Sequence, residues 1–120
     1  GYCLNQKMVI LKDLNAGYIC LSEKEQNDFH YEKGDTEGLV NYALSIRGIK
    51  FSAFFAERDG VVKTSFRSKG KFDVNIFARK HWNGGGHKNA AGGASKLKLQ
   101  ECEEKFLKEI ELYRNELSAK

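Results

Sequence analysis

The sequence predicts a single α/β domain, in which helices cover a mixed β-sheet that contains an antiparallel hairpin. Three observations predict this class. Two adjacent segments alternate apolar and polar residues around a glycine turn, other apolar residues recur at helical spacing, and strand-like and helix-like segments alternate along the chain. At 120 residues the chain is long enough for one hydrophobic core, so we expect one domain over residues 1–120.

The N-terminal part is expected to contribute two strands and two helices. Asn15-Ala16-Gly17 separates two apolar segments, as a turn between strands does. Ser22 with Glu25 three residues later forms a capping box, which marks a helix start. The expected elements are strands at 7–12 and 18–21, and helices at 23–30 and 36–46.

The clearest hairpin pairs residues 50–57 with residues 61–68 around the turn Arg58-Asp59-Gly60. One side of the first strand carries Phe51, Ala53 and Phe55. The same side of the second strand carries Val62, Thr64 and Phe66. The alternation places Lys63, Ser65 and Arg67 on the opposite face of the sheet, where the charges are either solvated or line a site.

The C-terminal part is expected to form a helix at 74–82 with Asp73 as its N-cap, a strand at 91–97, and a long helix at 99–118. Apolar residues of the last helix recur every three or four positions, which predicts packing on the sheet. A coiled-coil seam is the alternative, but the pattern covers fewer than three heptads.

Composition excludes several classes of protein. No apolar segment reaches the roughly 20 residues of a membrane helix, and no signal peptide is visible. Cys3, Cys20 and Cys102 lack CxxC spacing, which predicts reduced, partly buried thiols in the cytoplasm rather than disulfides or a zinc site. The chain begins Gly-Tyr, so we expect that an upstream part has been removed.

The segment Gly84-Gly85-Gly86-His87-Lys88, preceded by Asn83, is the strongest functional candidate. Consecutive glycines lose much backbone entropy on folding, and their N–H groups can converge on a phosphate. A flexible linker is the alternative. Charge favours the anion site, because residues 58–88 hold eight Lys/Arg against two Asp (+6), while the remainder holds twelve against fourteen acidic residues (−2).

Other side chains join this candidate site. Arg67 and Ser68 at the end of a strand offer a guanidinium and a hydroxyl to phosphate oxygens. Asn75 can hydrogen-bond a ligand or only solvate its helix end. His87 is able to act as a general acid or base or as a phosphate donor. We find no cluster of carboxylates and histidines, and assign no catalytic residue and no metal ligand to this chain.

Three segments resemble the C-terminal, DHH-associated substrate-binding domain of the DHH phosphoesterases. These segments are Lys63 to Ser68, Phe72 to Asn75, and Gly84 to Gly92. The resemblance runs from about Asn5 to Ser95 and is closest to the branch of small oligoribonucleases that also dephosphorylate 3′-phosphoadenosine 5′-phosphate. Related domains occur in RecJ-type exonucleases and in alanyl-tRNA synthetases.

The resemblance implies a two-domain hydrolase whose N-terminal DHH domain, missing from this chain, holds two manganese ions. This chain would need no cofactor of its own and would be inactive alone. Its implied partners are that domain and a short RNA or nucleotide bisphosphate, with no membrane; a homodimer of the full protein is left open. On matching positions, Arg67 and Ser68 would hold the terminal phosphate or sugar, and Gly84 to His87 would clamp the backbone.

Two hypotheses follow. The leading one is the substrate-binding half of a manganese-dependent phosphoesterase acting on short oligoribonucleotides or nucleotide bisphosphates. The alternative is a non-catalytic module for single-stranded nucleic acid or tRNA. Aromatic residues decide between them, because strand binders expose aromatic side chains among basic ones, and here only Trp82 is placed to stack on a base. The family commonly has a glycine where Asn83 stands, which leaves the contact at that position open.

Overall fold

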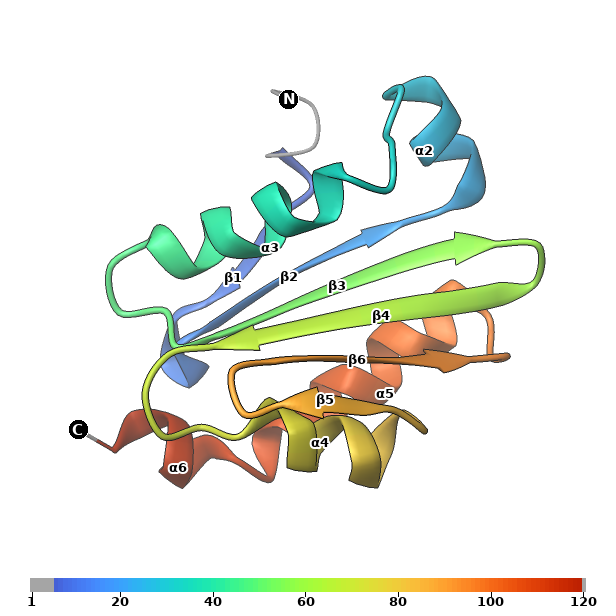
Figure 1. The fold of residues 1–120 in the computed structure, drawn as a ribbon. Helices are drawn as coiled ribbons and strands as arrows, with labels where there is room; N and C mark the ends of the chain where they lie inside the picture. The colour runs from blue at the N-terminus through green and yellow to red at the C-terminus, as the bar shows by residue number, and fades with distance from the viewer. Residues whose placement is uncertain (1–5, 120) are drawn as a thin grey trace.

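The computed structural model describes residues 6–119, which form a six-stranded sheet with helices on both faces (Figure 1). The order across the sheet is β1-β2-β3-β4-β6-β5. Only β2 and β3 are parallel, because α2 and α3 connect them, and all other neighbours are antiparallel. The strands are β1 Val9–Leu11, β2 Ala16–Leu21, β3 Phe51–Arg58, β4 Val61–Ser68, β5 Gly85–His87 and β6 Ala90–Ser95.

The predicted mixed sheet and its hairpin are confirmed. β3 pairs with β4 over their full lengths, with Phe55 opposite Thr64. Asp59 and Gly60 form the turn with φ angles of 54° and 79°, and a glycine takes the second value without strain.

Two layers of helices cover the sheet. The helices are α2 Glu23–Asp28, α3 Asp35–Ser45, α4 Val74–His81, α5 Leu99–Glu111 and α6 Arg114–Ser118, with a 3-10 turn at Lys12–Leu14. Both predicted helix starts are confirmed: Ser22 and Glu25 form the capping box, and the Asp73 carboxylate accepts from the N–H of Ile76 at 3.0 Å. Helices α2 and α3 lie on one face, and α4, α5 and α6 lie on the other (Figure 1).

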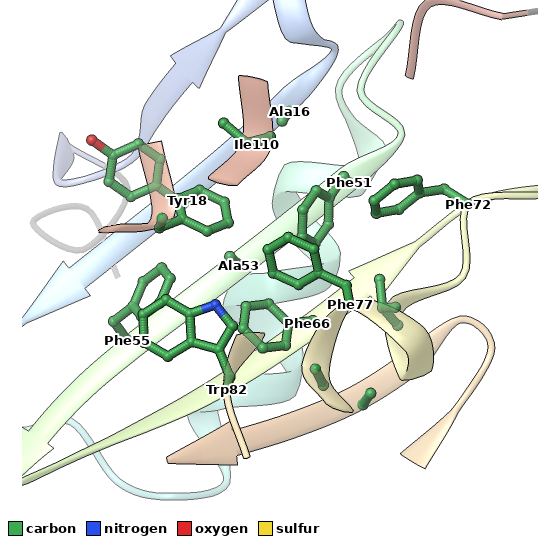
Figure 2. Packing of buried hydrophobic residues seen from close by; sticks show 14 of the residues in the cluster. Ala16, Tyr18, Phe51, Ala53, Phe55, Phe66, Phe72, Phe77, Trp82 and Ile110 are labelled. Atoms are coloured by element: carbon green, nitrogen blue, oxygen red, sulfur yellow. The ribbon is translucent and has the colours of Figure 1, made fainter. Parts of the chain in front are cut away.

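The larger core lies between the sheet and α4, α5 and α6. It is rich in aromatic rings, and Figure 2 shows Phe51, Phe55, Phe66, Phe77 and Trp82 packed together. A smaller core on the α3 face contains Ile19, Leu21, Leu39, Val40 and Phe54. The apolar alternation of β3 therefore supplies both cores, since Phe54 points away from its neighbours.

The predicted helix over 99–118 is too long. α5 ends at Glu111, and α6 begins at Arg114. Tyr113 interrupts the helix because its ring packs edge-on against Phe72 and Phe77, with ring centroids 5.6 and 5.4 Å apart. The new direction buries Leu117, whose carbonyl accepts from Asn15 at 2.9 Å.

The predicted strand at 91–97 ends earlier, at Ser95, and pairs with a strand that we did not expect, β5. Cys102 is buried and Cys20 is partly buried, both as free thiols, while Cys3 lies outside the described residues. Among residues 6–119, no helix combines the length and hydrophobicity that crossing a membrane requires.

Candidate functional site

The candidate site lies on the α3 face of the sheet, where β4, β6 and β5 extend beyond the helix (Figure 1). Its side chains alternate along β4 with those of the aromatic core. Lys63, Ser65 and Arg67 therefore face this side, as predicted, while Val62 and Phe66 are fully buried on the other.

Arg67 and His87 lie in one row across three strands. Arg67 is paired with Ala90 of β6, and Ala90 is paired with His87 of β5. Residues paired directly across strands share a face, so both side chains stand on the α3 face with the Ala90 methyl group between them. Two strand spacings, about 10 Å, separate their backbones. Two of the predicted site residues therefore lie in one row of the sheet, with Ala90 between them.

The residues beside Arg67 and His87 on β5 and β6 have small side chains or none. Gly92 pairs with Gly85, two residues along the strands from the Ala90–His87 pair and separated from it by the Gly86–Ala91 pair. Because these positions carry a hydrogen or a methyl group, a ligand can approach the backbone between Arg67 and His87. His87 is exposed at the edge of the sheet, and the Lys88 side chain is exposed at the adjoining turn.

The guanidinium of Arg67 is already engaged by protein groups. Its Nη2 lies 2.6 Å and its Nε 3.4 Å from the carboxylate of Glu37 on α3. Its Nη1 donates to the carbonyl oxygens of Phe66 at 2.9 Å and Ala91 at 3.4 Å. Sequence reasoning missed Glu37, because nothing local distinguishes it from any exposed acid in the first turn of a helix.

Ser68 lies on the opposite face of β4 from Arg67. It is 6% exposed, and its hydroxyl donates to the carbonyl of Phe72 at 2.6 Å and accepts from Nδ2 of Asn89 at 2.8 Å. Ser68 and Arg67 therefore do not converge on one ligand atom. Ser68 instead holds the turn that joins β5 to β6, next to His87.

The glycine segment forms an edge strand, and two of its N–H groups already have partners within the domain. The N–H of Gly84 donates to the carbonyl of Ala78 at 3.2 Å, and the N–H of Gly86 donates to Oδ1 of Asn75 at 2.9 Å. Oδ1 of Asn75 also accepts from Nε of Arg79 at 3.1 Å. Asn75 thus anchors β5 to the first turn of α4, and these two N–H groups are not free to meet a phosphate.

Close approach of backbones explains the glycines themselves. A Cβ atom on Gly84 would lie 1.9 Å from the carbonyl oxygen of Gly92, and one on Gly93 would lie 2.3 Å from that of Trp82. No side chain fits at such distances. Packing therefore accounts for a glycine at positions 84 and 93.

Trp82 is buried and not exposed for stacking on a base, which corrects our expectation. It is 1% exposed, and its Nε1 donates to Oε1 of Glu109 at 2.8 Å. The ammonium of Lys105 lies 3.8 Å above the indole ring and also pairs with Glu109. Glu109 was missed, although a charged residue beside Ile110 on the apolar stripe of a helix is a signal for a buried polar contact.

His81 belongs to the same polar group. Its Nε2 lies 2.7 Å from the hydroxyl of Tyr113, and its Nδ1 lies 3.5 Å from Oε2 of Glu109. Burial lowers the pKa of His81 below the usual 6.5, against the opposing effect of Glu109. These contacts fix the end of α4, from which the glycine strand departs.

A groove of about 530 Å³ continues the site along β4 toward α2. Lys63, Lys33 and Arg58 line it, with Asp59 as the opposing charge. Lys63 is four residues from Arg67 along the strand, about 13 Å. We call the stretch of β4 from Lys63 to Arg67 the basic face. Its length is about that of four stacked nucleotides at 3.4 Å each.

The described residues do not fit a manganese site. Within residues 6–119, no three side chains of His, Cys, Asp or Glu stand close enough together to hold a metal ion. We assign no metal-dependent step to these residues.

Comparison with known proteins identifies similar chains. The DHHA1 domain family matches residues 9–116. The bifunctional oligoribonuclease and PAP phosphatase NrnA of Bacillus subtilis is 34% identical over 86 residues, which cover 72% of this chain and 27% of that protein.

Two solved structures share the fold. An exopolyphosphatase-related protein from Bacteroides fragilis superposes with a TM-score of 0.92 at 40% identity, over 98% of this chain and 35% of that one. The pGpG-specific phosphodiesterase PggH from Vibrio cholerae superposes with a TM-score of 0.64 at 16% identity, over 91% of this chain and 36% of that one. The chain thus spans at most 36% of each of these proteins.

Proposed function

The chain belongs to the DHHA1 domain family, and on this premise we propose that it binds the phosphate-bearing end of a short oligoribonucleotide or of a nucleotide bisphosphate. In this proposal a separate DHH domain carries the catalytic groups and the manganese ions of a phosphoesterase. The chain itself supplies binding and orientation.

The observation that carries this proposal is the row of Arg67 and His87 across β4, β6 and β5 on the α3 face of the sheet. A guanidinium offers planar N–H donors that match phosphate oxygens, and an imidazole can donate one further hydrogen bond. Since only the small side chain of Ala90 lies between Arg67 and His87, a phosphate can lie against the backbone within reach of both.

The remaining predicted residues serve this row indirectly. Asn75 holds the N–H of Gly86, and Ser68 holds Asn89 at the turn that follows His87. Together they determine the position of β5 and hence of the imidazole. Lys88 adds an exposed positive charge at the same turn.

Two further observations support a short ligand. The basic face from Lys63 to Arg67 extends about 13 Å, which suits a few nucleotides. The single tryptophan is buried, and the Tyr31 ring that lines the groove is already stacked on Phe54, so neither ring is free to stack on a base in this structure. The name of the Bacillus subtilis relative, an oligoribonuclease and PAP phosphatase, agrees with both substrate classes.

Calorimetric titration of the 120-residue chain with the dinucleotide pApA and with adenosine 3′,5′-bisphosphate tests the proposal. Arg67→Ala and His87→Ala should each weaken binding by about 1–3 kcal/mol, which is about 5- to 150-fold. Lys80→Ala is the matched control, since Lys80 is an exposed cation of α4 on the other side of the sheet.

Unchanged affinity in both site variants would overturn the assignment. Tighter binding of a 20-nucleotide strand or of tRNA than of pApA would favour the single-strand or tRNA-binding alternative.

A further inference from the structure

The groove on the α3 face lies along the same strand as Arg67. The side chains of Lys63, Ser65 and Arg67 point to one face of β4, because alternate residues of a strand do so. Lys63 and Ser65 line the groove of about 530 Å³, and Arg67 is the next residue on this face. A ligand that has its terminal phosphate at Arg67 can therefore extend along the strand into the groove.

The lining of the groove carries an excess of positive charge. Lys33, Arg58 and Lys63 contribute three cations, and Asp59 contributes the opposing charge. Within residues 6–119, none of these three cations forms an ion pair with an acidic side chain. The excess charge is therefore available to an anionic ligand, and it attracts such a ligand to this face.

Hydrogen bonds from α2 hold the wall of the groove in place. Gln26 is 3% exposed, and its Nε2 donates to the carbonyl of Glu57 at 2.6 Å. Its Oε1 accepts from Nη2 of Arg58 at 3.3 Å, and Oε1 of Glu23 accepts from the N–H of Asp59 at 2.9 Å. Figure 1 shows α2 at the end of the sheet where the β3–β4 hairpin turns. The fold therefore preorganises the groove, so ligand binding does not have to order this part of the chain.

We propose that this groove is a second phosphate-binding subsite, which receives an internal phosphodiester of the oligoribonucleotide whose terminal phosphate lies at Arg67. Lys63 is the residue that contacts this diester, because it shares a strand and a face with Arg67. The inference rests on the proposed function, since it takes Arg67 as the site of the terminal phosphate. Its consequence is that the domain distinguishes ligands by length.

The distance between the two subsites determines which ligands reach both. Lys63 and Arg67 are four residues apart on β4, about 13 Å. A stacked strand rises about 3.4 Å per nucleotide, so its fifth phosphate lies about 13 Å from its first, and in a more extended strand an earlier phosphate does. The mononucleotide pA has no internal phosphate. Occupation of the groove should therefore begin at about three to five nucleotides.

The experiment is a calorimetric titration with 5′-phosphorylated oligoadenylates, from pA to the pentanucleotide. All of them carry the same terminal phosphate, so the cost of displacing Glu37 from Arg67 is common to all and cancels when lengths are compared. The 120-residue chain is titrated as wild type, Lys63→Gln and Lys63→Arg. Lys80→Gln is the matched control, because it removes the same charge from an exposed position of α4 on the other side of the sheet.

Lys63→Gln should weaken binding of the pentanucleotide by about two- to fivefold, the range that one exposed charge contact allows. Binding of pA should stay unchanged, because about 13 Å exceeds the Debye length of about 8 Å at physiological salt. The slope of log K against log salt concentration should fall by about 0.7 for the pentanucleotide and not for pA, since each contacted phosphate of a single strand contributes that amount. Lys63→Arg, which keeps the charge, and Lys80→Gln should bind every ligand as the wild type does.

An equal loss of affinity at every length in Lys63→Gln, or no loss at any length, would overturn the inference. Arg67→Ala separates this failure from a failure of the proposed function. If Arg67→Ala weakens pA binding while Lys63→Gln shows no dependence on length, the terminal phosphate site stands and the groove is not a subsite. If Arg67→Ala leaves pA binding unchanged, the terminal phosphate site itself is wrong. A thermal melt of each variant verifies folding.

Discussion

The Nη2 atom of Arg67 lies 2.6 Å from Oε2 of Glu37, which joins strand β4 to helix α3 across the candidate site. The two side chains differ in exposure, at 18% for Arg67 and 61% for Glu37. The cation is thus fixed within the sheet while its acidic partner reaches in from solvent. This asymmetry matters more for what binds Arg67 than for the stability of the fold.

Glu37→Gln should lower the free energy of unfolding by less than about 1 kcal/mol, because exposed ion pairs contribute little. Urea unfolding measures this. Glu109→Gln is the informative comparison, since that carboxylate is buried and accepts from Trp82 and Lys105. It should lose about 1–3 kcal/mol. A larger loss in Glu37→Gln than in Glu109→Gln would contradict our account of the Arg67 ion pair.

Gly84→Ala should destabilise the domain by about 3 kcal/mol or more, since the new Cβ would lie 1.9 Å from the carbonyl oxygen of Gly92 and the strands would have to separate. Gly38→Ala is the control, because no atom lies within 4 Å of the added Cβ and the residue is within helix α3. It should stabilise by about 0.5–1 kcal/mol. Equal unfolding midpoints for the two variants would show that β5 does not need the glycine.

The sequence was sufficient for elements whose signal is local. The β3–β4 hairpin follows from alternation around Asp59 and Gly60, and α4 follows from its Asp73 cap. It was insufficient where distant residues decide the outcome. β5 contains Gly85 and Gly86, and glycine has a low strand propensity. The strand forms because its backbone pairs with β6 and because the N–H of Gly86 donates to Asn75 on α4.

The site was predictable by residue type but not by arrangement. The sequence predicted Arg67 and His87 as binding residues from their side-chain chemistry and from the nearby glycine segment. Their place in one row depends on the register of β6, which lies between their strands. The expected pairing of Arg67 with Ser68 ignored the alternation of side chains along a strand. Glu37 comes from a helix 30 residues earlier, and no local pattern connects it to Arg67.

Ser68→Ala should lower the free energy of unfolding by about 1–3 kcal/mol, because Asn89 and the carbonyl of Phe72 lose their buried partner. Together with Asn89→Ala it should give a coupling energy of about 0.5–3 kcal/mol in a double-mutant cycle. Ser65→Ala, on the open face of the same strand, should change stability by less than about 0.5 kcal/mol. If Ser68 instead contacts the ligand directly, Ser68→Ala would weaken pApA binding and leave stability unchanged.

His81 should make the domain less stable in mild acid. Burial lowers its pKa below the usual 6.5, so the folded state takes up its proton only at a lower pH than the unfolded state does. The unfolded state therefore binds more protons in this window, and stability falls as the pH drops from 6.5 toward the folded-state pKa. Glu109, Lys105, Lys80 and the Tyr113 hydroxyl are the groups that face the imidazole.

His81→Gln should flatten this pH dependence, measured as the difference between unfolding free energies at pH 7 and pH 5.5. His87→Gln, which changes an exposed histidine, is the control and should retain the wild-type difference. An unchanged difference in His81→Gln would assign the pH dependence to other groups.

The fluorescence of Trp82, the only tryptophan, should report a buried indole that does not touch the ligand. Its ring centroid lies 5.3 Å from that of Phe55. Figure 2 shows both rings within the core. Acrylamide and iodide should quench it weakly, and saturating pApA or polyuridylate should not quench it. Trp82→Phe should retain pApA affinity while losing stability, because Glu109 loses a buried donor.

The opposite result would change the functional assignment. Quenching that follows the binding curve of polyuridylate, together with lost affinity in Trp82→Phe, would mean that the indole reaches a base by stacking. Since base stacking contributes about 1–3 kcal/mol per base to the binding of single strands, such a site would prefer long strands to phosphate ends. With the indole 1% exposed, stacking would require α4 and the glycine strand to separate from α5. The polar contacts of Glu109 with Trp82, Lys105 and His81 oppose that separation.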